Sequence, residues 1–400
     1  MHRLVPVPVR VAEPGELVRF DAALRAALDG SGPAVLPVAD DGVPGGAGTG
    51  RTAAGKVADG VADDVAVVVG TSGSGGEPRH VLLSAGALHA SARATHARLC
   101  GPGRWVLALP LGHVAGVQVL VRSVVAGTEA VPLPAGSFDP VAAAGVIRSA
   151  RTANLPLYTA LVPTQLHRVV AGATGGSLPA ALRPWRDLDA VLVGGAATPE
   201  PLLDRARELG LRVVTTYGMT ETCGGCVYDG VPLDGVQVRV TDRVLLAGPV
   251  LASGDLGRPD LDAEAFEQVD GVRWLRTPDA GELVGDRLRV LGRVDEVIVT
   301  GGRKVAPIAV EAALADVTGV GQVCVVGVPD PEWGQAVTAV VVPEPGAPVP
   351  ELAELRQAAA AALGGHASPR RLLLVDALPL RGPGKVDRAA VTAAAADAAS

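Results

Sequence analysis

The stretch from Asp64 to Arg79 (DVAVVVGTSGSGGEPR) has the composition of a loop that binds phosphate groups. An apolar strand pattern ends in a run of threonine, serine and glycine, closes with a Pro-Arg pair, and leads into a helix with an expected cap near Ser84. Small residues allow backbone N–H groups and hydroxyls to converge on phosphate oxygens. The run lacks the lysine of a Walker A loop and the third glycine of a dinucleotide fingerprint. A surface loop without a ligand is the plain alternative.

Three further segments combine residues that suit a nucleotide and its metal ion. Residues 215–222 (TTYGMTET) offer an aromatic ring, hydroxyls and the carboxylate of Glu221, which is a suitable ligand for Mg²⁺. Residues 292–311 (GRVDEVIVTGGRKVAPIAVE) include Arg293, whose planar guanidinium can bind ribose or phosphate. Residues 381–388 (RGPGKVDR) place Lys385 in a Gly/Pro loop. The alternative without a ligand is an exposed strand end for residues 215–222, a solvated charge cluster for residues 292–311 and a solvated lysine for residues 381–388. Only two other lysines occur, Lys56 and Lys304, and this scarcity favours a function for Lys385.

Bulk composition excludes several classes of protein. The chain has 400 residues, which is too long for one compact core and predicts two or three units. The net charge is −7 without a basic tract, so nothing indicates nucleic-acid binding. No apolar run reaches the length of a membrane-spanning helix, since the candidate 117–126 contains Arg122. The first ten residues carry prolines instead of a signal-peptide core, and the protein is therefore expected in the cytoplasm.

The cysteines Cys100, Cys223, Cys226 and Cys324 do not form a convincing metal site. Cys223 and Cys226 have the spacing of a redox or zinc pair, but no second pair or nearby histidine completes the ligand set. Buried thiols in a tight turn are the favoured interpretation.

Strand patterns alternate with helix patterns from residue 65 to about residue 215. The expected strands are 65–69, 105–109, 157–162, 190–193 and 212–215, and the expected helices are 85–99, 115–126, 141–150 and 199–209. Such alternation predicts an α/β fold with mostly parallel, doubly wound sheets. Residues 225–292 carry short strand and turn patterns and predict a β-rich subdomain, whereas residues 40–50 read as a loop.

The last hundred residues predict a separate, mobile α+β domain. Its pattern is strand, helix, strand, strand, helix and strand, and an alanine-rich helix follows Lys385. The expected division is therefore a nucleotide- and acyl-binding domain of residues 1–292 and a C-terminal domain of residues 293–400 that carries this lysine.

The four segments, in this order and at these separations, resemble the adenylate-forming superfamily of acyl-CoA synthetases, peptide-synthetase adenylation domains and luciferases. The resemblance covers about residues 65–388. It implies a phosphate loop at Thr71, Ser72, Gly73, Ser74, Gly75, Gly76 and Arg79, in which arginine replaces the usual lysine. It implies an adenine seat at Gly194, Gly195, Ala196, Thr216, Tyr217, Gly218 and Met219. Thr220 and Glu221 match the catalytic ATP and Mg²⁺ positions.

Further residues match the superfamily toward the C-terminus. Asp279 matches the ribose-binding aspartate, although Pro278 replaces the usual glycine, and Arg293 matches the ribose and phosphate arginine. Asp295 matches the hinge and Lys385 the lysine that catalyses adenylation. The resemblance also implies that Gly301, Gly302 and Lys304 line a tunnel for coenzyme A.

Within the superfamily, residues 109–127 (LPLGHVAGVQVLVRSVVAG) and 161–166 (LVPTQL) look like the o-succinylbenzoate–CoA ligases of menaquinone biosynthesis. His113 is the expected wall of the acyl pocket, with a core histidine as the alternative. Gln118 and Arg122 lie one helical turn apart and could bind the second carboxylate of such an acid. The alternative is that the Arg122 side chain points to solvent or pairs with an acidic residue.

The resemblance implies an ATP-dependent ligase that forms an acyl-AMP and then a CoA thioester. The expected ligands are a small acid, ATP, Mg²⁺ and coenzyme A, without nucleic acid or membrane insertion, and a homodimer is compatible with the sequence. Another aryl- or acyl-CoA ligase and an adenylation enzyme that loads a carrier protein are alternatives, although the chain contains no phosphopantetheine-attachment segment. A non-catalytic AMP-binding protein is the alternative of a different class, suggested by Arg79 and Pro278.

Overall fold

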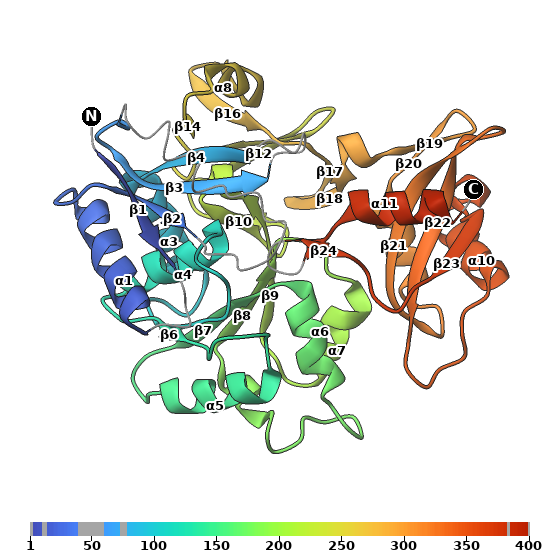
Figure 1. Ribbon diagram of the computed structural model, residues 1–400, viewed down its shortest axis with the longest axis horizontal. Coiled ribbons are helices and arrows are strands. Elements are labelled where there is room, and N and C mark those ends of the chain that lie inside the picture. The colour runs from blue at the N-terminus through green and yellow to red at the C-terminus, as the bar shows by residue number, and fades with distance from the viewer. Residues whose placement is uncertain (1–2, 10–13, 39–59, 73–77, 382–384, 399–400) are drawn as a thin grey trace. The chain divides into compact units, whose positions relative to one another are not determined.

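The computed structural model describes residues 3–9, 14–38, 60–72, 78–381 and 385–398. Backbone contacts divide the chain into two compact units (Figure 1). The larger unit contains residues 1–195, 206–239 and 245–276, and the smaller contains residues 196–205, 240–244 and 277–400. The functional domain boundary at residue 292 and the hinge at Asp295 stay predictions.

A five-stranded sheet in the larger unit contains the strands that flank the predicted phosphate loop. Its order is β1-β2-β3-β4-β14, with β1, β2 and β3 parallel and the other two strands antiparallel to their neighbours. A cluster of buried Leu, Val and Ala side chains from β1, β2 and β3 lies on this sheet. The strands are β1 (Leu4–Pro8), β2 (Ala34–Val38), β3 (Val65–Ser72), β4 (Pro78–Ser84) and β14 (Gly254–Asp255).

A seven-stranded sheet forms the second layer and confirms the predicted parallel alternation. Its order is β11-β10-β9-β8-β7-β5-β6, and the pairs from β9 to β6 are parallel. β7 and the first four residues of β8 are buried, as expected for a parallel strand covered on both faces. The strands are β5 (Arg104–Leu107), β6 (Val131–Pro132), β7 (Leu157–Leu161), β8 (Ala190–Gly194), β9 (Val213–Met219), β10 (Gly224–Tyr228) and β11 (Val231–Pro232).

Helices separate and cover the two sheets (Figure 1). Helix α3 contacts β3 and β4 of the first sheet and β10 of the second, and α4 packs beside it on β5, β7 and β10. Helix α5 contacts β5, and α6 contacts β8. The helices of this region are α1 (Pro14–Asp29), α3 (Ala85–Arg98), α4 (Val114–Val125), α5 (Pro140–Ala150), α6 (Pro163–Ala171) and α7 (Glu200–Glu208). Among the described residues no helix is both long and apolar enough to cross a membrane.

The segment after the predicted phosphate loop corrects the sequence interpretation. The loop was expected between a strand and a helix, but residues 78–84 form β4, which pairs antiparallel with β3. Val81 and Leu83 are buried and alternate with partly exposed neighbours, a period of two that favours a strand. The expected helix then begins at residue 85, and the Ser84 hydroxyl caps it by accepting from the backbone N–H of Ala87 at 3.1 Å.

Residues 225–292 are rich in β-structure, as predicted, and contain one short helix, α8 (Pro259–Ala265). β13 and β16 pair antiparallel, as do β15 and β16 and the β17–β18 hairpin. The strands that follow β11 here are β12 (Gln237–Val240), β13 (Val244–Ala247), β14, β15 (Phe266–Val269), β16 (Val272–Arg276), β17 (Asp279–Val284) and β18 (Arg287–Arg293).

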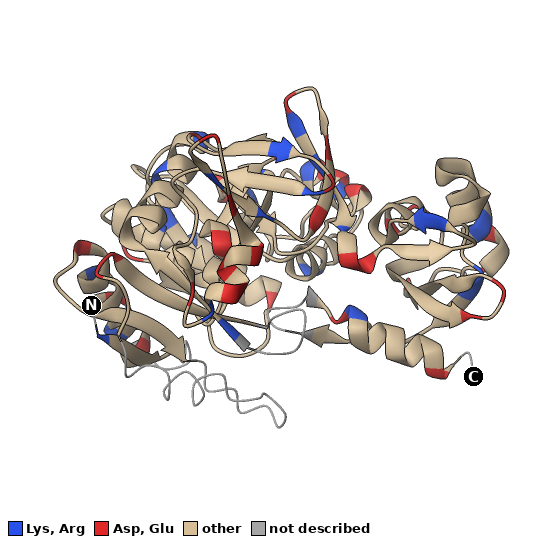
Figure 2. Cartoon of the chain, turned by 90° about the horizontal axis from the view of Figure 1, so that it is seen from above, with Lys and Arg blue, Asp and Glu red and all other residues tan. Residues whose placement is uncertain are grey.

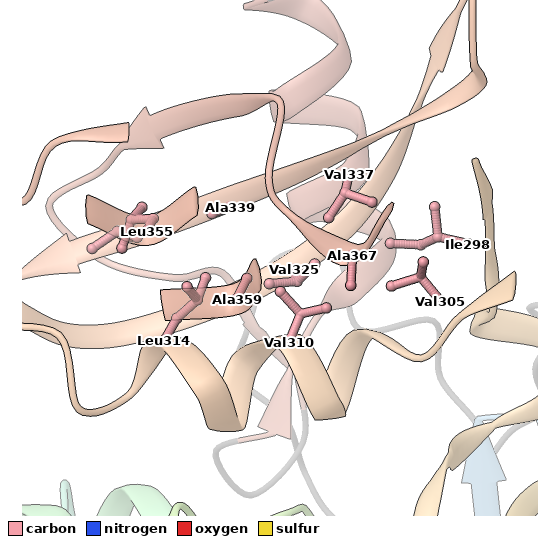
Figure 3. Packing of buried hydrophobic residues seen from close by; sticks show 11 residues of the cluster. Ile298, Val305, Val310, Leu314, Val325, Val337, Ala339, Leu355, Ala359 and Ala367 are labelled. Carbon is pink, nitrogen blue, oxygen red and sulfur yellow. The ribbon is translucent and has the colours of Figure 1, made fainter. Parts of the chain in front are cut away.

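The smaller unit carries a five-stranded sheet with helices packed on it. Its strands are β19 (Ile298–Thr300), β20 (Arg303–Val305), β21 (Val320–Asp330), β22 (Gly334–Pro343) and β23 (Arg371–Leu374). Figure 3 shows Val310 and Leu314 of one helix close to Val325 of β21, within a buried cluster of Val, Leu, Ile and Ala. The helices are α9 (Pro307–Leu314), α10 (Leu352–Leu363) and α11 (Arg388–Asp397). This order confirms the predicted α+β pattern, to which the structure adds β20 and a short ribbon of β24 (Leu380–Arg381) and β25 (Lys385–Val386).

Candidate active site

Arg79, the last residue of the predicted phosphate loop, lies between two carboxylates. Its guanidinium forms a two-point ion pair with Asp255, and its Nη2 lies 3.9 Å from Glu221 Oε1. Burial lowers the pKa of Arg79, but the hydrogen bond and the charge of Asp255 raise it above its ordinary value overall. Asp255 is only 4 % exposed, and its backbone N–H donates to Asp262 Oδ1 at 2.7 Å. The arginine that replaces the usual lysine is therefore fixed beside the predicted metal ligand.

The turn after β9 holds Glu221 in place through its backbone. Glu221 lies in a short 3₁₀ helix, residues 220–222, and its carbonyl accepts from the backbone N–H of Ala252 at 2.8 Å. The hydroxyl of Thr222 accepts from the Met219 N–H at 2.9 Å and lies 2.7 Å from the Gly224 carbonyl. A Cβ on Gly218 would lie 2.1 Å from that same carbonyl, so only glycine permits this close approach. The turn is thus a rigid support for one carboxylate.

The predicted adenine seat lies at the ends of two adjacent parallel strands. Gly194 is the last residue of β8, and its register partner on β9 is Thr216. A Cβ on Gly194 would approach the Thr216 hydroxyl oxygen to 2.2 Å, which explains a glycine at this position. Gly195 follows with a φ of 85°, a conformation that glycine adopts without strain. Ligands of α/β folds bind outside the carboxyl ends of such strands, so the location agrees with the predicted function.

Helix α4 carries the predicted acyl residues and touches the same turn. His113 is its N-cap residue. Gln118 is fully buried, and its Nε2 donates to the Cys223 carbonyl at 2.7 Å, two residues beyond Glu221. Ser91 on α3 donates to the same carbonyl at 3.3 Å. The helix that is predicted to bind the acid is therefore hydrogen-bonded to the residue that follows the predicted ATP-binding segment 215–222.

Arg122 lies one turn further along α4 and is 4 % exposed. Its Nη2 donates to the Tyr228 hydroxyl at 3.3 Å, and its guanidinium carbon lies 4.9 Å from the centre of the Trp105 ring. Within the described part of the chain no carboxylate pairs with this guanidinium, and its Nε has no hydrogen-bond partner. The plain readings of solvent exposure and of an acidic partner are therefore both wrong for this residue. Burial of a charged group without an opposite charge is unfavourable, so an anionic ligand would stabilise it.

His96 on α3 is buried near Arg122 and makes the stability of the fold depend on pH. Burial and the nearby Arg122 charge lower the pKa of His96 to about 4. Above its ordinary pKa of 6.5 the imidazole is neutral in both the folded and the unfolded chain. Between pH 6.5 and about 4 the unfolded chain binds a proton that the folded chain does not. The free energy of unfolding should therefore fall as pH decreases through this window, by about 1 kcal/mol per pH unit.

Urea unfolding measured at several pH values checks this expectation. The variant His96→Gln cannot titrate and should show a shallower decrease between pH 6.5 and 4 than the wild type. Identical slopes for the two proteins would contradict the assignment of the slope to His96.

Arg93, His96 and Val125 also line a surface hollow of about 390 Å³, to which none of the predicted site residues contributes.

Two predicted nucleotide-binding residues of the smaller unit are neighbours. Asp279 opens β17 and pairs in register with Arg293, the last residue of β18. Arg293 donates to Asp295 from Nε at 2.8 Å and from Nη2 at 2.6 Å. The hydrogen bond and charge of Asp295 raise the pKa of Arg293, while that of Asp295 is lowered by the same pairing. A carboxylate and a guanidinium side by side suit the hydroxyls and phosphate of a nucleotide.

The remaining predicted residues of the smaller unit lie on two turns. Gly301 and Gly302 connect β19 to β20 with φ values of 54° and 74°, and Lys304 on β20 is exposed. Lys385 opens β25, where its backbone pairs with Arg381 of β24. Ala196 also belongs to this unit. The residues Gly73, Ser74, Gly75 and Gly76 of the predicted phosphate loop, and the expected loop at residues 40–50, lie outside the described residues.

Cys223 and Cys226 are both fully buried. Burial raises the pKa of each thiol, that of Cys226 to about 12, which disfavours the thiolate that metal binding requires. In the described ranges no group of three histidine, cysteine or acidic side chains could hold a metal ion. We expect the variant Cys223→Ala with Cys226→Ala to retain most of its activity per folded molecule. Metal analysis of the wild-type protein checks the reasoning, since stoichiometric zinc that is lost in the variant would contradict it.

The sequence did not predict two residues that bind arginines of the site. Asp255 and Tyr228 hold Arg79 and Arg122, but both belong to short segments without a motif. Asp255 is separated from Arg79 by 176 positions, so only the pairing of β4 with β14 brings them together. No local signal in the sequence marks either residue.

Comparisons with known proteins identify the family of the chain. Residues 19–252 match the family model described as AMP-binding enzyme, and residues 309–385 match the AMP-binding enzyme C-terminal domain. The chain is 44 % identical over 377 residues to a Mycobacterium tuberculosis protein named "Probable 2-succinylbenzoate--CoA ligase", covering 92 % of this chain and 93 % of that protein. It is 30 % identical over 356 residues to a feruloyl-CoA synthase of Amycolatopsis, covering 81 % of this chain and 68 % of that protein.

Solved structures support the fold. The o-succinylbenzoate CoA synthetase of Bacillus subtilis, in complex with its acyl-adenylate intermediate, superposes with a TM-score of 0.73 at 22 % identity. That alignment covers 97 % of this chain and 87 % of the other. The matched ranges include the Glu221 turn and Lys385. The chain belongs to the AMP-binding enzyme family.

Proposed function

We propose that the chain is an o-succinylbenzoate–CoA ligase of menaquinone biosynthesis that acts in the cytoplasm. The 44 % identity to a relative of nearly equal length supports the substrate class. The observation that carries the choice of acid is the buried Arg122, which lacks a carboxylate partner among the described residues. o-Succinylbenzoate has two carboxylates, of which one reacts and the other needs a cationic or hydrogen-bonding partner. Arg122 supplies the charge, and Gln118 supplies a polar group one turn earlier on α4.

The first half-reaction joins the acid to AMP. The aliphatic carboxylate oxygen attacks the α-phosphorus of ATP, and the bond to pyrophosphate breaks. Such transfers depend mainly on positioning and on stabilisation of charge. Arg79 and the phosphate loop would hold the β- and γ-phosphates, and Lys385 would bind the reacting carboxylate and the α-phosphate together. Thr216 and Tyr217 would face the base, while Asp279 and Arg293 would hold the ribose.

Glu221 fits a magnesium ion. A single protein carboxylate together with substrate phosphates is the usual set of ligands for Mg²⁺, and the Glu221 turn is fixed by the hydrogen bond to Ala252. When bound, the ion would neutralise phosphate charge during the reaction. Arg79, 3.9 Å from Glu221, would supply positive charge from the protein at the same place.

The second half-reaction transfers the acyl group to coenzyme A. The thiol sulfur attacks the acyl carbon, the bond to AMP breaks, and the thiol proton passes to solvent. We assign the Gly301–Gly302 turn and Lys304 to the thiol tunnel, and Asp295 to the hinge about which residues 293–400 turn between the two steps. Lys385 therefore serves only the first step. A homodimer is compatible with this scheme, and sedimentation of the purified protein tests it.

Product analysis tests the proposed function. The purified protein should form AMP and a CoA thioester from ATP, coenzyme A and o-succinylbenzoate, as measured by mass spectrometry. A better rate with ferulate would favour another aryl-CoA ligase, and acyl-AMP without any CoA thioester would favour a carrier-loading enzyme. Failure of every tested acid to support ATP–pyrophosphate exchange would favour a non-catalytic AMP-binding protein.

A further inference from the structure

The backbone that carries Lys385 is continuous with helix α11. Lys385 and Val386 form β25, and the N–H of Asp387 donates to the Pro379 carbonyl at 2.8 Å, which closes the β24–β25 ribbon. The Asp387 side chain then caps α11, whose first residue is Arg388. Three residues span at most about 11 Å even when fully extended. The position of Arg388 therefore restricts where the backbone of Lys385 can lie.

Arg388 is bound on one side to the core of the smaller unit. Its guanidinium donates to both carboxylate oxygens of Glu311 on α9, at 2.7 and 3.1 Å, and to the Val325 carbonyl at 2.8 Å. Glu311 also accepts from the Val325 N–H at 2.7 Å, so the carboxylate is itself fixed. Two-point pairing of this kind defines the orientation of a guanidinium as well as its position.

The other side of Arg388 reaches the predicted hinge. Its Nε lies 3.0 Å from Glu296 Oε2, and Glu296 is the residue that follows Asp295. The second oxygen of Glu296 lies 3.7 Å from Arg293 Nε, and Arg293 in turn binds Asp295. Glu296 is thus placed between an arginine of β18 and an arginine of α11. A chain of ion pairs connects the lysine segment to the hinge.

We propose that Arg388 is a positioning residue for Lys385, which it acts on by fixing the lysine segment to Glu296 at the hinge. The inference rests on the proposed function, because it assigns Lys385 to acyl-adenylate formation and the hinge to Asp295. The C-terminal domain, which contains both Glu296 and the lysine segment, then turns about Asp295 as one body. Reacting groups must be held within a fraction of an ångström, and a lysine on a short two-stranded ribbon needs such an anchor.

The contact between Arg388 and Glu296 is not needed to hold α11 on the sheet. Val391 and Ala395 of this helix are already buried among Cys324, Val326 and Val340. Apart from Arg388 and Asp397 at its ends, α11 carries no charged residue (Figure 2). Apolar packing and Glu311 therefore hold the helix on the sheet. The contact with Glu296 adds a connection to the hinge instead.

The variant Glu296→Gln tests the proposal by separating the two half-reactions. Adenylation is measured as acid-dependent ATP–pyrophosphate exchange, and thioester formation is measured with supplied acyl-AMP and coenzyme A. The loss of one charge-assisted hydrogen bond should lower kcat for adenylation about tenfold and leave the KM values for ATP and acid within about twofold. Thioester formation from acyl-AMP should stay within about twofold of the wild type, because it does not use Lys385.

Two further variants separate positioning from general damage. Arg388→Lys keeps the charge but loses the planar fork, and should show the same selective loss of adenylation. Asp330→Asn is the matched control, because it removes a pair with Arg371 of similar length, 2.8 Å, that does not reach the hinge. It should keep pyrophosphate exchange within about twofold of the wild type.

The outcomes distinguish this inference from the proposed function. Equal losses in both half-reactions for Glu296→Gln, or no loss in adenylation, would overturn the positioning role of Arg388. The proposed ligase function would still stand in that case, provided that the wild-type protein is active. If Arg388→Lys does not fold, the comparison rests on Glu296→Gln and its Asp330→Asn control. A wild-type protein without pyrophosphate exchange for any acid would overturn the proposed function and this inference together.

Discussion

Lys385→Ala should lower the rate of acyl-adenylate formation by about 100- to 1,000-fold, as expected for the loss of a charge that stabilises a transition state. Thioester formation from supplied acyl-AMP should change little, because the lysine is assigned to the first half-reaction only. ATP–pyrophosphate exchange and single-turnover thioester formation measure the two steps separately.

Lys304→Ala is the matched variant for Lys385→Ala. Lys304 is exposed on β20 beside the Gly301–Gly302 turn and is assigned to the coenzyme A tunnel. Its removal should lower thioester formation more than adenylation, which is the opposite pattern. Equal loss of both half-reactions in Lys385→Ala would contradict the assignment of this lysine to a single step.

Arg122→Ala should raise the KM for o-succinylbenzoate about 10- to 100-fold, as expected for the loss of a charge-assisted contact in a buried site. The KM for a mono-acid analogue that lacks the ring carboxylate should rise much less. The reason is that Arg122 is 4 % exposed and its guanidinium has only the Tyr228 hydroxyl and the Trp105 ring as described partners. Steady-state kinetics with the two acids measure the difference.

Two control variants accompany Arg122→Ala. Arg122→Lys keeps the charge and should recover part of the preference for the diacid, although an ammonium cannot form the same planar contacts. Tyr228→Phe removes the hydroxyl that binds Arg122 and should affect both acids similarly if it acts only on packing. Equal KM changes for the diacid and the mono-acid in Arg122→Ala would show that Arg122 is structural. The ligase assignment would then stand without this explanation of its specificity.

The alternating elements of the larger unit could be predicted because their signal is local. Runs of valine, leucine and alanine such as residues 65–69 and 190–193 are buried on both faces and read as strands whatever their partners. β4 was not predicted, because Pro78 and Arg79 at its start lack the pattern of a strand and its stability comes from β3 and β14. Pairing between distant segments is not encoded in any short stretch of sequence.

The residues of the candidate site also differ in whether a local sequence signal predicts them. Glu221 and Lys385 lie in segments whose composition already indicates chemistry. Asp255 lies on the two-residue strand β14, and Glu296 follows the predicted hinge residue Asp295. Neither was predicted to act in the site, and their importance appears only when the fold brings an arginine to each. The sequence also could not predict the environment of Arg122, because one sequence does not determine which face of a helix is buried. In the structure this residue is buried.

Helix α4 is buried without interruption from Gly116 to Ser123, against β5, β7, β10 and α3. A change of acid specificity on this helix therefore cannot come from a single substitution that enlarges a side chain, because a packed interior accommodates extra volume only by strain. Enzymes with altered preference would need compensating changes on α4 and on the strand or helix that it contacts. Directed evolution of this scaffold should accordingly select paired substitutions, with members such as Gln118 and Ser91 that already share one carbonyl partner.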